Sequence, residues 1–254
     1  MVKVYKFKNM KILSIFFLVL LTSCQKEKHT IKTVPATPLE TKTETVAITQ
    51  EKFLKTDTIS ISDDGETSKE NYILAHLLDQ KADKDSVVTA RYRLDFYLNK
   101  TKTADSKITI TGIEKGSEWG AKYGLASVES PKNSPFIQIS FGYPACGYTS
   151  NNYLYYLKNT NLQLVHQWYA MSDSGWGTWV RFENSTSKTN TESFYCKTVS
   201  FEPENDNDEM GTVTYSDSIV FRLSGNHWKK ELLSAKDKVY FEKKIPFNEF
   251  HDLD

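Results

Sequence analysis

Aromatic side chains beside a glycine-rich turn form the most suggestive chemical stretch of the sequence. Trp168 is followed within a few residues by the segment SDSGWGTW, which contains Asp173, Trp176 and Trp179. Indole rings at flexible turns can stack on sugar faces or insert into a protein partner. We therefore predict ligand binding at Trp176, Trp179 and Asp173. The alternative is that Trp168 and Trp179 are core residues and that only Trp176 is exposed.

The N-terminal segment 1–21 has the pattern of an export signal. A basic region with four lysines and no acidic residue precedes an apolar run of ten residues, 12–21. A helix that crosses a bilayer needs about 20 apolar residues, whereas the apolar region of a secretory signal needs about 7–15. The length of the run therefore favours an export signal over a membrane span.

The tetrapeptide that ends this pattern, Leu21-Thr22-Ser23-Cys24, resembles the lipobox of bacterial lipoproteins. The resemblance covers residues 1–24 only. It implies cleavage after Ser23 and a diacylglycerol on the thiol of Cys24, which becomes the new N-terminus. Two or three acyl chains anchor a protein stably, because each buried methylene adds about 0.8 kcal/mol. We expect a lipid-anchored protein of the outer membrane, with both the periplasmic face and the cell surface compatible with the sequence.

Cys146 and Cys196 are the cysteines left after Cys24. An exported protein resides in an oxidising compartment, so we predict a disulfide between them. Two separate thiols are the alternative, because free cysteines are common in protein cores. His166 is expected at the edge of the core, on the same face as Leu164 and Trp168.

The sequence holds no recognisable catalytic or cofactor motif. It has no HExxH or CxxC spacing, no nucleophile elbow and no phosphate-binding glycine loop. We therefore predict no metal and no cofactor, and we regard an enzyme as the less favoured interpretation. Carboxylates suited to glycan hydrolysis are present but scattered along the chain, at Asp95, Glu118, Asp173 and Glu183. Such an enzyme needs two carboxyl groups about 5 Å or more apart across a cleft.

The charge balance argues against nucleic-acid binding. The chain has 32 basic and 32 acidic residues, and the predicted signal removes four of the lysines, which leaves 28 against 32 and a net charge of −4. Nucleic-acid binders usually show a basic excess. The mature chain that would begin at Cys24 has room for one domain of ordinary size.

The mature chain divides into a tether, 24–56, and a single β-rich domain, 57–254. The tether is rich in Thr, Lys, Glu and Pro and poor in aromatics, so it cannot bury enough apolar surface to fold. In the domain, alternating or β-branched segments are separated by turn residues. The strands are predicted at 87–98, 106–113, 136–143, 152–158, 162–171, 178–183, 193–201, 211–223 and 237–242.

These short strands predict a mainly β fold, an antiparallel sandwich or a barrel-like domain. Two similar hairpins leave a small β-propeller as the alternative. One N-terminal helix is predicted over 67–78, where a capping-box pattern precedes apolar residues at helical spacing. A strand in the same place is the alternative.

With no catalytic pattern, the leading hypothesis is a non-enzymatic binding module of the cell envelope. Its partners are the membrane, through the lipid, and a glycan or protein ligand. Two alternatives stay open: an envelope glycan hydrolase, and an immunity or inhibitor lipoprotein that neutralises an exported toxin.

Overall fold

The structure is a computed structural model that describes residues 51–63, 66–125, 134–144, 147–183, 192–204 and 207–251. All of these residues belong to the compact unit 49–254. The predicted export signal, Cys24 and most of the predicted tether lie outside the described residues.

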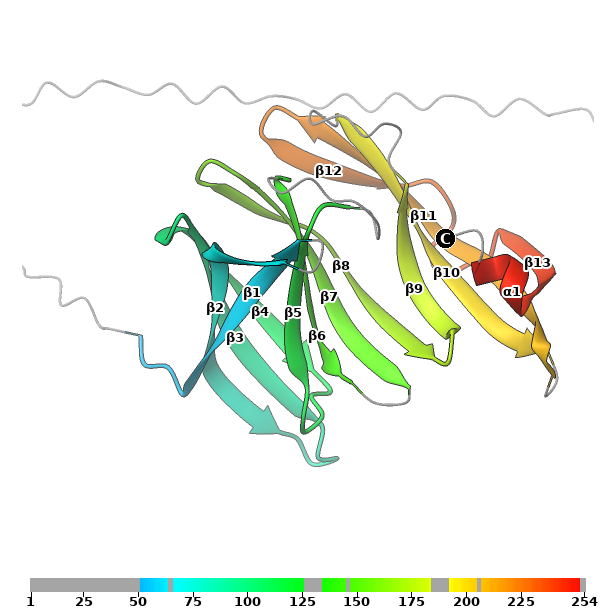
Figure 1. Ribbon diagram of the computed structural model, residues 1–254, viewed down its shortest axis with the longest axis horizontal. Helices are drawn as coiled ribbons and strands as arrows, with labels where there is room; N and C mark the ends of the chain where they lie inside the picture. The colour runs from blue at the N-terminus through cyan, green and yellow to red at the C-terminus, as the bar shows by residue number, and fades with distance from the viewer. Residues whose placement is uncertain are drawn as a thin grey trace, which may run out of the picture. The chain divides into compact units, whose positions relative to one another are not determined.

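The described part contains thirteen strands and one short helix (Figure 1). The elements are β1 (Lys55–Asp63), β2 (Glu66–Ala82), β3 (Val88–Leu98), β4 (Thr101–Thr111), β5 (Glu118–Tyr123), β6 (Phe136–Tyr143), β7 (Tyr148–Lys158), β8 (Asn161–Asp173), β9 (Trp176–Glu183), β10 (Ser193–Glu204), β11 (Asn207–Ser224), β12 (His227–Leu232), β13 (Phe241–Pro246) and α1 (Phe247–His251).

All thirteen strands belong to one open sheet. Its order is β12-β11-β10-β9-β8-β7-β6-β5-β1-β2-β3-β4, and β13 pairs with β11 beside β12. Every pair is antiparallel except the short β1–β5 pair, so the sheet is mixed. The predicted mainly β fold is confirmed. Its strands form a single curled sheet within the described residues, with neither two stacked sheets nor separate blades.

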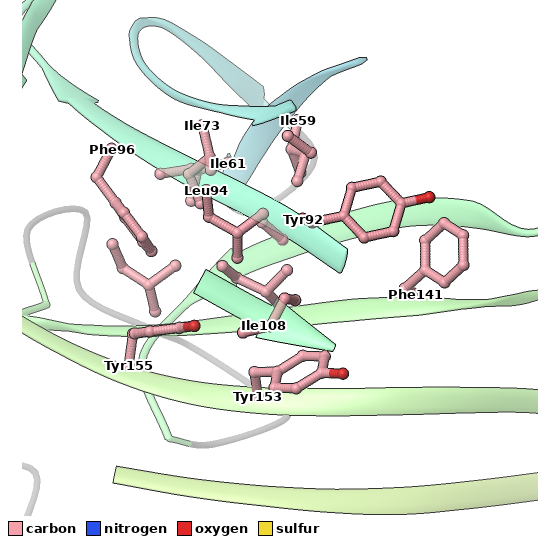
Figure 2. Close-up of a cluster of buried hydrophobic side chains, with 14 of the residues drawn as sticks. Ile59, Ile61, Ile73, Tyr92, Leu94, Phe96, Ile108, Phe141, Tyr153 and Tyr155 are labelled. Carbon is pink, nitrogen blue, oxygen red and sulfur yellow. The ribbon is translucent and has the colours of Figure 1, made fainter. Parts of the chain in front are cut away.

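The curled sheet encloses two apolar cores, one on each side of β7. Strand residues alternate between faces, and Tyr153, Tyr155 and Leu157 pack in a first core with side chains from β1 to β6. Figure 2 shows Tyr153 and Tyr155 meeting residues of β3 and β4 there. Leu154 and Tyr156 face the second core, formed with β6, β8, β10, β11 and β12. β7 is thus buried on both faces and joins the two halves of the sheet.

Side chains of β8 form hydrogen bonds with the backbone at the start of β12. The amide of Gln163 donates to the carbonyl of Trp228 and accepts from its N–H, both at 2.7 Å. Asn161 donates to the carbonyl of Asn226 at 2.8 Å. These bonds fasten β12 to β8 in the way a strand ladder would, although the two strands are not neighbours in the sheet.

The predicted N-terminal helix is wrong. Residues 67–78 lie in β2, which pairs with β1 and β3, and the helix of the described part is α1 at the other end of the chain. Ile73, Ala75 and Leu77 alternate into the first core, while Leu74 and His76 face the other side. Because this strand carries apolar residues on both faces, its sequence also matches helical spacing.

Candidate functional site

The residues predicted to bind a ligand are all in the β8–β9 hairpin, but their roles differ. Trp176 and Trp179 are half-buried and pack against a third apolar cluster, built by β10, β11, β13 and α1. The Trp176 ring stacks on Phe201 with centroids 4.5 Å apart, and the Trp179 ring meets Phe250 of α1 at 5.7 Å. The structure therefore places both indoles where they help to hold α1 on the sheet.

Asp173 is exposed at the start of the turn and accepts a hydrogen bond from the Ser174 hydroxyl at 3.0 Å. Close packing around Trp176 is visible at Gly211, where an added Cβ would lie 2.4 Å from the Trp176 ring. The structure thus brings Trp176 and Trp179 together beneath α1 and leaves Asp173 outside their cluster.

The predicted disulfide is not formed. Cys196 is a free thiol, 2% exposed, and it packs in the second core; Cys146 lies outside the described residues. Burial raises the pKa of the Cys196 thiol to about 12, so it stays protonated at neutral pH. Cys196 acts as a small apolar residue opposite Ile219 in the β10–β11 ladder.

His166 lies against the second core, but not on the face of Leu164. The β7–β8 register shifts between Leu154 and Tyr155, where Val165 is the extra residue of a β-bulge. His166 therefore turns to Trp168 and Phe221, with ring centroids 5.7 and 5.5 Å away. Its Nδ1 is buried without a hydrogen-bond partner. Burial, helped by nearby Lys230, lowers the pKa of His166 to about 4, so the ring is neutral at pH 7.

A buried carboxylate network, which the sequence analysis missed, lies on the outer face of β1–β4. Asp95 is 3% exposed. Its carboxylate lies 2.9 Å from Nε of Arg93, 3.0 Å from Nζ of Lys102 and 3.3 Å from Nε2 of His76. Nδ1 of His76 in turn meets the Thr56 hydroxyl at 2.8 Å. The sequence feature that could have indicated this network is the alternation in β3, where Arg91, Arg93 and Asp95 share the face opposite the core residues.

This Thr–His–Asp chain has the order of a nucleophile relay, but its charges suit a structural role. Burial alone would raise the pKa of Asp95, yet hydrogen bonds from Lys102 and Arg93 outweigh burial and hold that pKa below its ordinary value. A carboxylate neutralised by two cations gives little help to a histidine that must take up a proton. Asp105, opposite Asp95 in the ladder, also lies near Lys102, with Nζ of Lys102 3.2 Å from its carboxylate.

The network also holds the start of the body. Residues 51–54 lie over it as a strap: the Glu51 carboxylate meets Arg93 and Lys107, both at 2.7 Å. The Phe53 ring stacks on His76 at 4.1 Å, and the Arg93 guanidinium lies 4.5 Å from the centre of that ring. The body thus begins at or before Glu51, earlier than the predicted boundary at residue 57. A hollow of about 310 Å³ beside the strap is lined by residues that include Glu51, Arg91 and Lys107.

A surface rich in aromatic residues, exposed at its β8 side, continues the inner face of the first core across β5 to β8. We call it the binding face and define it by two cross-strand rows. The rows are Trp119–Phe141–Asn151–Tyr169 and Tyr143–Thr149–Met171. Directly paired residues of neighbouring strands share one face of a sheet. Three strand spacings make the longer row about 14 Å wide.

Exposure increases along the binding face toward β8. Phe141 is buried and its ring lies 4.5 Å from that of Trp119. Tyr169 is 58% exposed and Met171 45% exposed. The indole N–H of Trp119 is buried without a hydrogen-bond partner, which leaves one donor unsatisfied at the border between the core and this face.

Comparison with known protein families, curated proteins and solved structures finds no match for this chain. Within the described residues, no three or more His, Cys, Asp and Glu side chains gather in a way that could hold a metal ion. In the same part of the chain, no helix has the length and apolar character needed to span a membrane.

Proposed function

We propose that this chain is an exported lipoprotein of the outer membrane, anchored through Cys24, and that its β domain is a non-enzymatic module that binds a protein partner. The observation that carries the binding proposal is the binding face, with Tyr169 and Met171 exposed at its β8 side. The anchoring proposal rests on the resemblance of residues 1–24 to a lipoprotein signal.

The composition of the binding face favours a protein over a small ligand. Tyr, Trp, Phe and Met are the residues enriched in the cores of protein interfaces, and polar residues are usual at their rims. Here Trp119, Tyr169 and Met171 are interleaved with Asn151 and Thr149. Small ligands bind in concave pockets, whereas this face extends across four neighbouring strands of the sheet.

The strap lies apart from the binding face. Glu51 and Phe53 fix the first described residues to β2, β3 and β4. The strap lies on the outer face of the strands that enclose the first core. The binding face continues the inner face, so residues 51–54 do not cover it.

Capture of a partner from solubilised envelope tests the binding face. We expect the double variant Tyr169→Ala/Met171→Ala to lose a partner that the unchanged chain retains. Tyr148→Ala is the matched control: Tyr148 is an exposed tyrosine of β7, but it pairs with Ser172 and therefore lies on the opposite face. Equal capture by the double variant and the unchanged chain would refute the proposal. If the chain instead binds purified envelope glycan, and this binding depends on Tyr169, the ligand of the binding face is a glycan and not a protein.

Lipidation is tested separately, by Cys24→Ser. We expect this variant to carry no acyl chains, whereas the unchanged chain carries them. An acylated Cys24→Ser protein would overturn the anchor. An exported toxin neutralised by this chain is one protein partner of the proposed kind, and the same capture experiment detects it.

A further inference from the structure

A second exposed apolar surface lies at the C-terminal end of the sheet, away from the residues of the binding face. Among the described residues, five of the twelve exposed large hydrophobic side chains fall within the segment 232–241. The most exposed are Val239 at 56%, Leu233 at 51% and Tyr240 at 48%. Surface hydrophobic residues scattered singly need no explanation, but a concentration of this kind marks an interaction site.

Three hydrogen bonds hold this segment against a short stretch of β11. The Leu233 N–H donates to the carbonyl of Ser218 at 2.7 Å, and the Tyr240 N–H donates to that of Tyr215 at 3.0 Å. In the middle, the Asp237 N–H donates to the Asp217 carboxylate at 2.8 Å. Residues 215–218 span about 10 Å of strand. The segment 232–241, here called the docking loop, therefore leaves and rejoins the sheet at nearly the same place (Figure 1).

Lysines lie within and next to the docking loop. Residues 229–241 contain four lysines, Lys229, Lys230, Lys236 and Lys238, against two acids, Glu231 and Asp237. All four lysines are exposed. Glu231 is paired with Arg222 of β11 at 2.7 Å, and Nζ of Lys236 lies 3.8 Å from the Asp237 carboxylate. Residues 229–241 thus combine exposed apolar side chains with an excess of two lysines over acids.

We propose that the docking loop binds the surface of an anionic bilayer, with Leu233, Val239 and Tyr240 at the level of the lipid headgroups and acyl chains. Aliphatic residues with a nearby tyrosine and several lysines match the chemistry of that interface. The apolar side chains enter it, the phenol hydroxyl stays at its wet side, and lysines attract anionic headgroups. The choice of a membrane as the partner rests on the proposed envelope address; the binding itself does not require lipidation.

The test uses the chain from residue 24 with Cys24→Ser, which lacks the apolar signal and the acyl chains but keeps the whole described body. Its partitioning is measured by co-sedimentation with vesicles of phosphatidylglycerol and phosphatidylcholine at equal amounts, and with pure phosphatidylcholine. We expect clear preference for the anionic vesicles. Tyr240→Asp is expected to weaken partitioning about tenfold or more, because an apolar ring is replaced by a charge. Lys236→Glu/Lys238→Glu is expected to weaken it at least about fivefold.

Two variants control for folding and for general surface effects. Tyr240→Trp keeps an aromatic side chain suited to the interface and is expected to retain binding. Tyr169→Asp alters a comparably exposed tyrosine of the binding face and is expected to leave vesicle binding unchanged. Circular dichroism checks that each variant keeps its β structure.

Several results would overturn the inference. The unchanged chain could show no preference for anionic vesicles, or Tyr240→Asp could bind as well as the unchanged chain. A doubled mass in light scattering that Tyr240→Asp abolishes would assign the docking loop to a second copy of this chain instead. Because lipidation at Cys24 and partner capture through Tyr169 are measured in other assays, failure here is distinguishable from failure of the proposed function.

Discussion

Acidification between pH 7 and pH 5 is expected to destabilise this protein through one side chain, His166. The ring is packed between Trp168 and Phe221, and its buried Nδ1 has no hydrogen-bond partner. Burial lowers its pKa from 6.5 to about 4. The unfolded chain therefore takes up a proton near pH 6.5, whereas the folded protein resists protonation until pH approaches about 4.

The sign and size of the effect follow from this difference. In the window between the two pKa values the unfolded state binds more protons, so folding stability falls as pH falls. Each unit of pKa difference is worth about 1.4 kcal/mol. Between pH 7 and pH 5 the loss amounts to about 2 kcal/mol, and it levels off below pH 4. Lowered carboxylate pKa values, such as that of Asp95 from 3.8, act mainly at lower pH and contribute little in this window.

Urea unfolding at pH 7 and pH 5, followed by circular dichroism, measures the loss. His166→Phe keeps an aromatic ring against Trp168 but cannot be protonated, so we expect its stability to change little between the two pH values. His227→Phe is the matched control, because His227 is exposed at the start of β12. Equal stability of the unchanged protein at the two pH values would refute this expectation, and so would an equal loss in His166→Phe.

Two other expectations concern Cys196 and Trp179. In a chain from residue 24 with Cys24→Ser and Cys146→Ser, the thiol of Cys196 should resist iodoacetamide at pH 8 until urea unfolds the protein, since its pKa is about 12; rapid labelling of the folded protein would contradict its burial. Trp179→Ala should lower the free energy of unfolding by about 2–3 kcal/mol through lost packing on Phe250. If Trp179→Ala leaves the free energy of unfolding unchanged but abolishes partner binding, Trp179 is a ligand contact, as the sequence predicts.

Many of the strands could be predicted because apolar and polar residues alternate along a strand that is buried on one face. In β3, residues such as Ala90, Leu94 and Phe96 alternate with Arg91 and Arg93, and the prediction over 87–98 matches the observed strand Val88–Leu98 closely. Alternation fixes which face is buried but not which core it meets. The two faces of β7 are buried by different sets of strands, β1 to β6 in the first core and mainly β8 and β10 to β12 in the second, and the sequence of β7 does not say which strands these are.

Register irregularities explain the errors that alternation alone produces. The bulge at Val165 moves His166 and Trp168 to the face opposite Leu164, so residues at even spacing no longer share a surface. Downstream of that bulge, Tyr169 and Met171 pair with Asn151 and Thr149 and reach the inner face of the sheet. A single extra residue thus decides that these two exposed side chains belong to the binding face and that His166 belongs to the second core.

The choice of binding residues shows the same limit at longer range. The sequence pattern predicts ligand contacts at Trp176 and Trp179, because indole rings beside a flexible turn are good contact groups. Their burial, however, depends on Phe247 and Phe250, which lie in α1 at the C-terminal end of the described part of the chain. Tyr169 lies in the same hairpin without such a cover and stays exposed. Which aromatic residue of this hairpin can meet a partner is therefore decided by the position of α1, and the hairpin's own sequence does not contain that information.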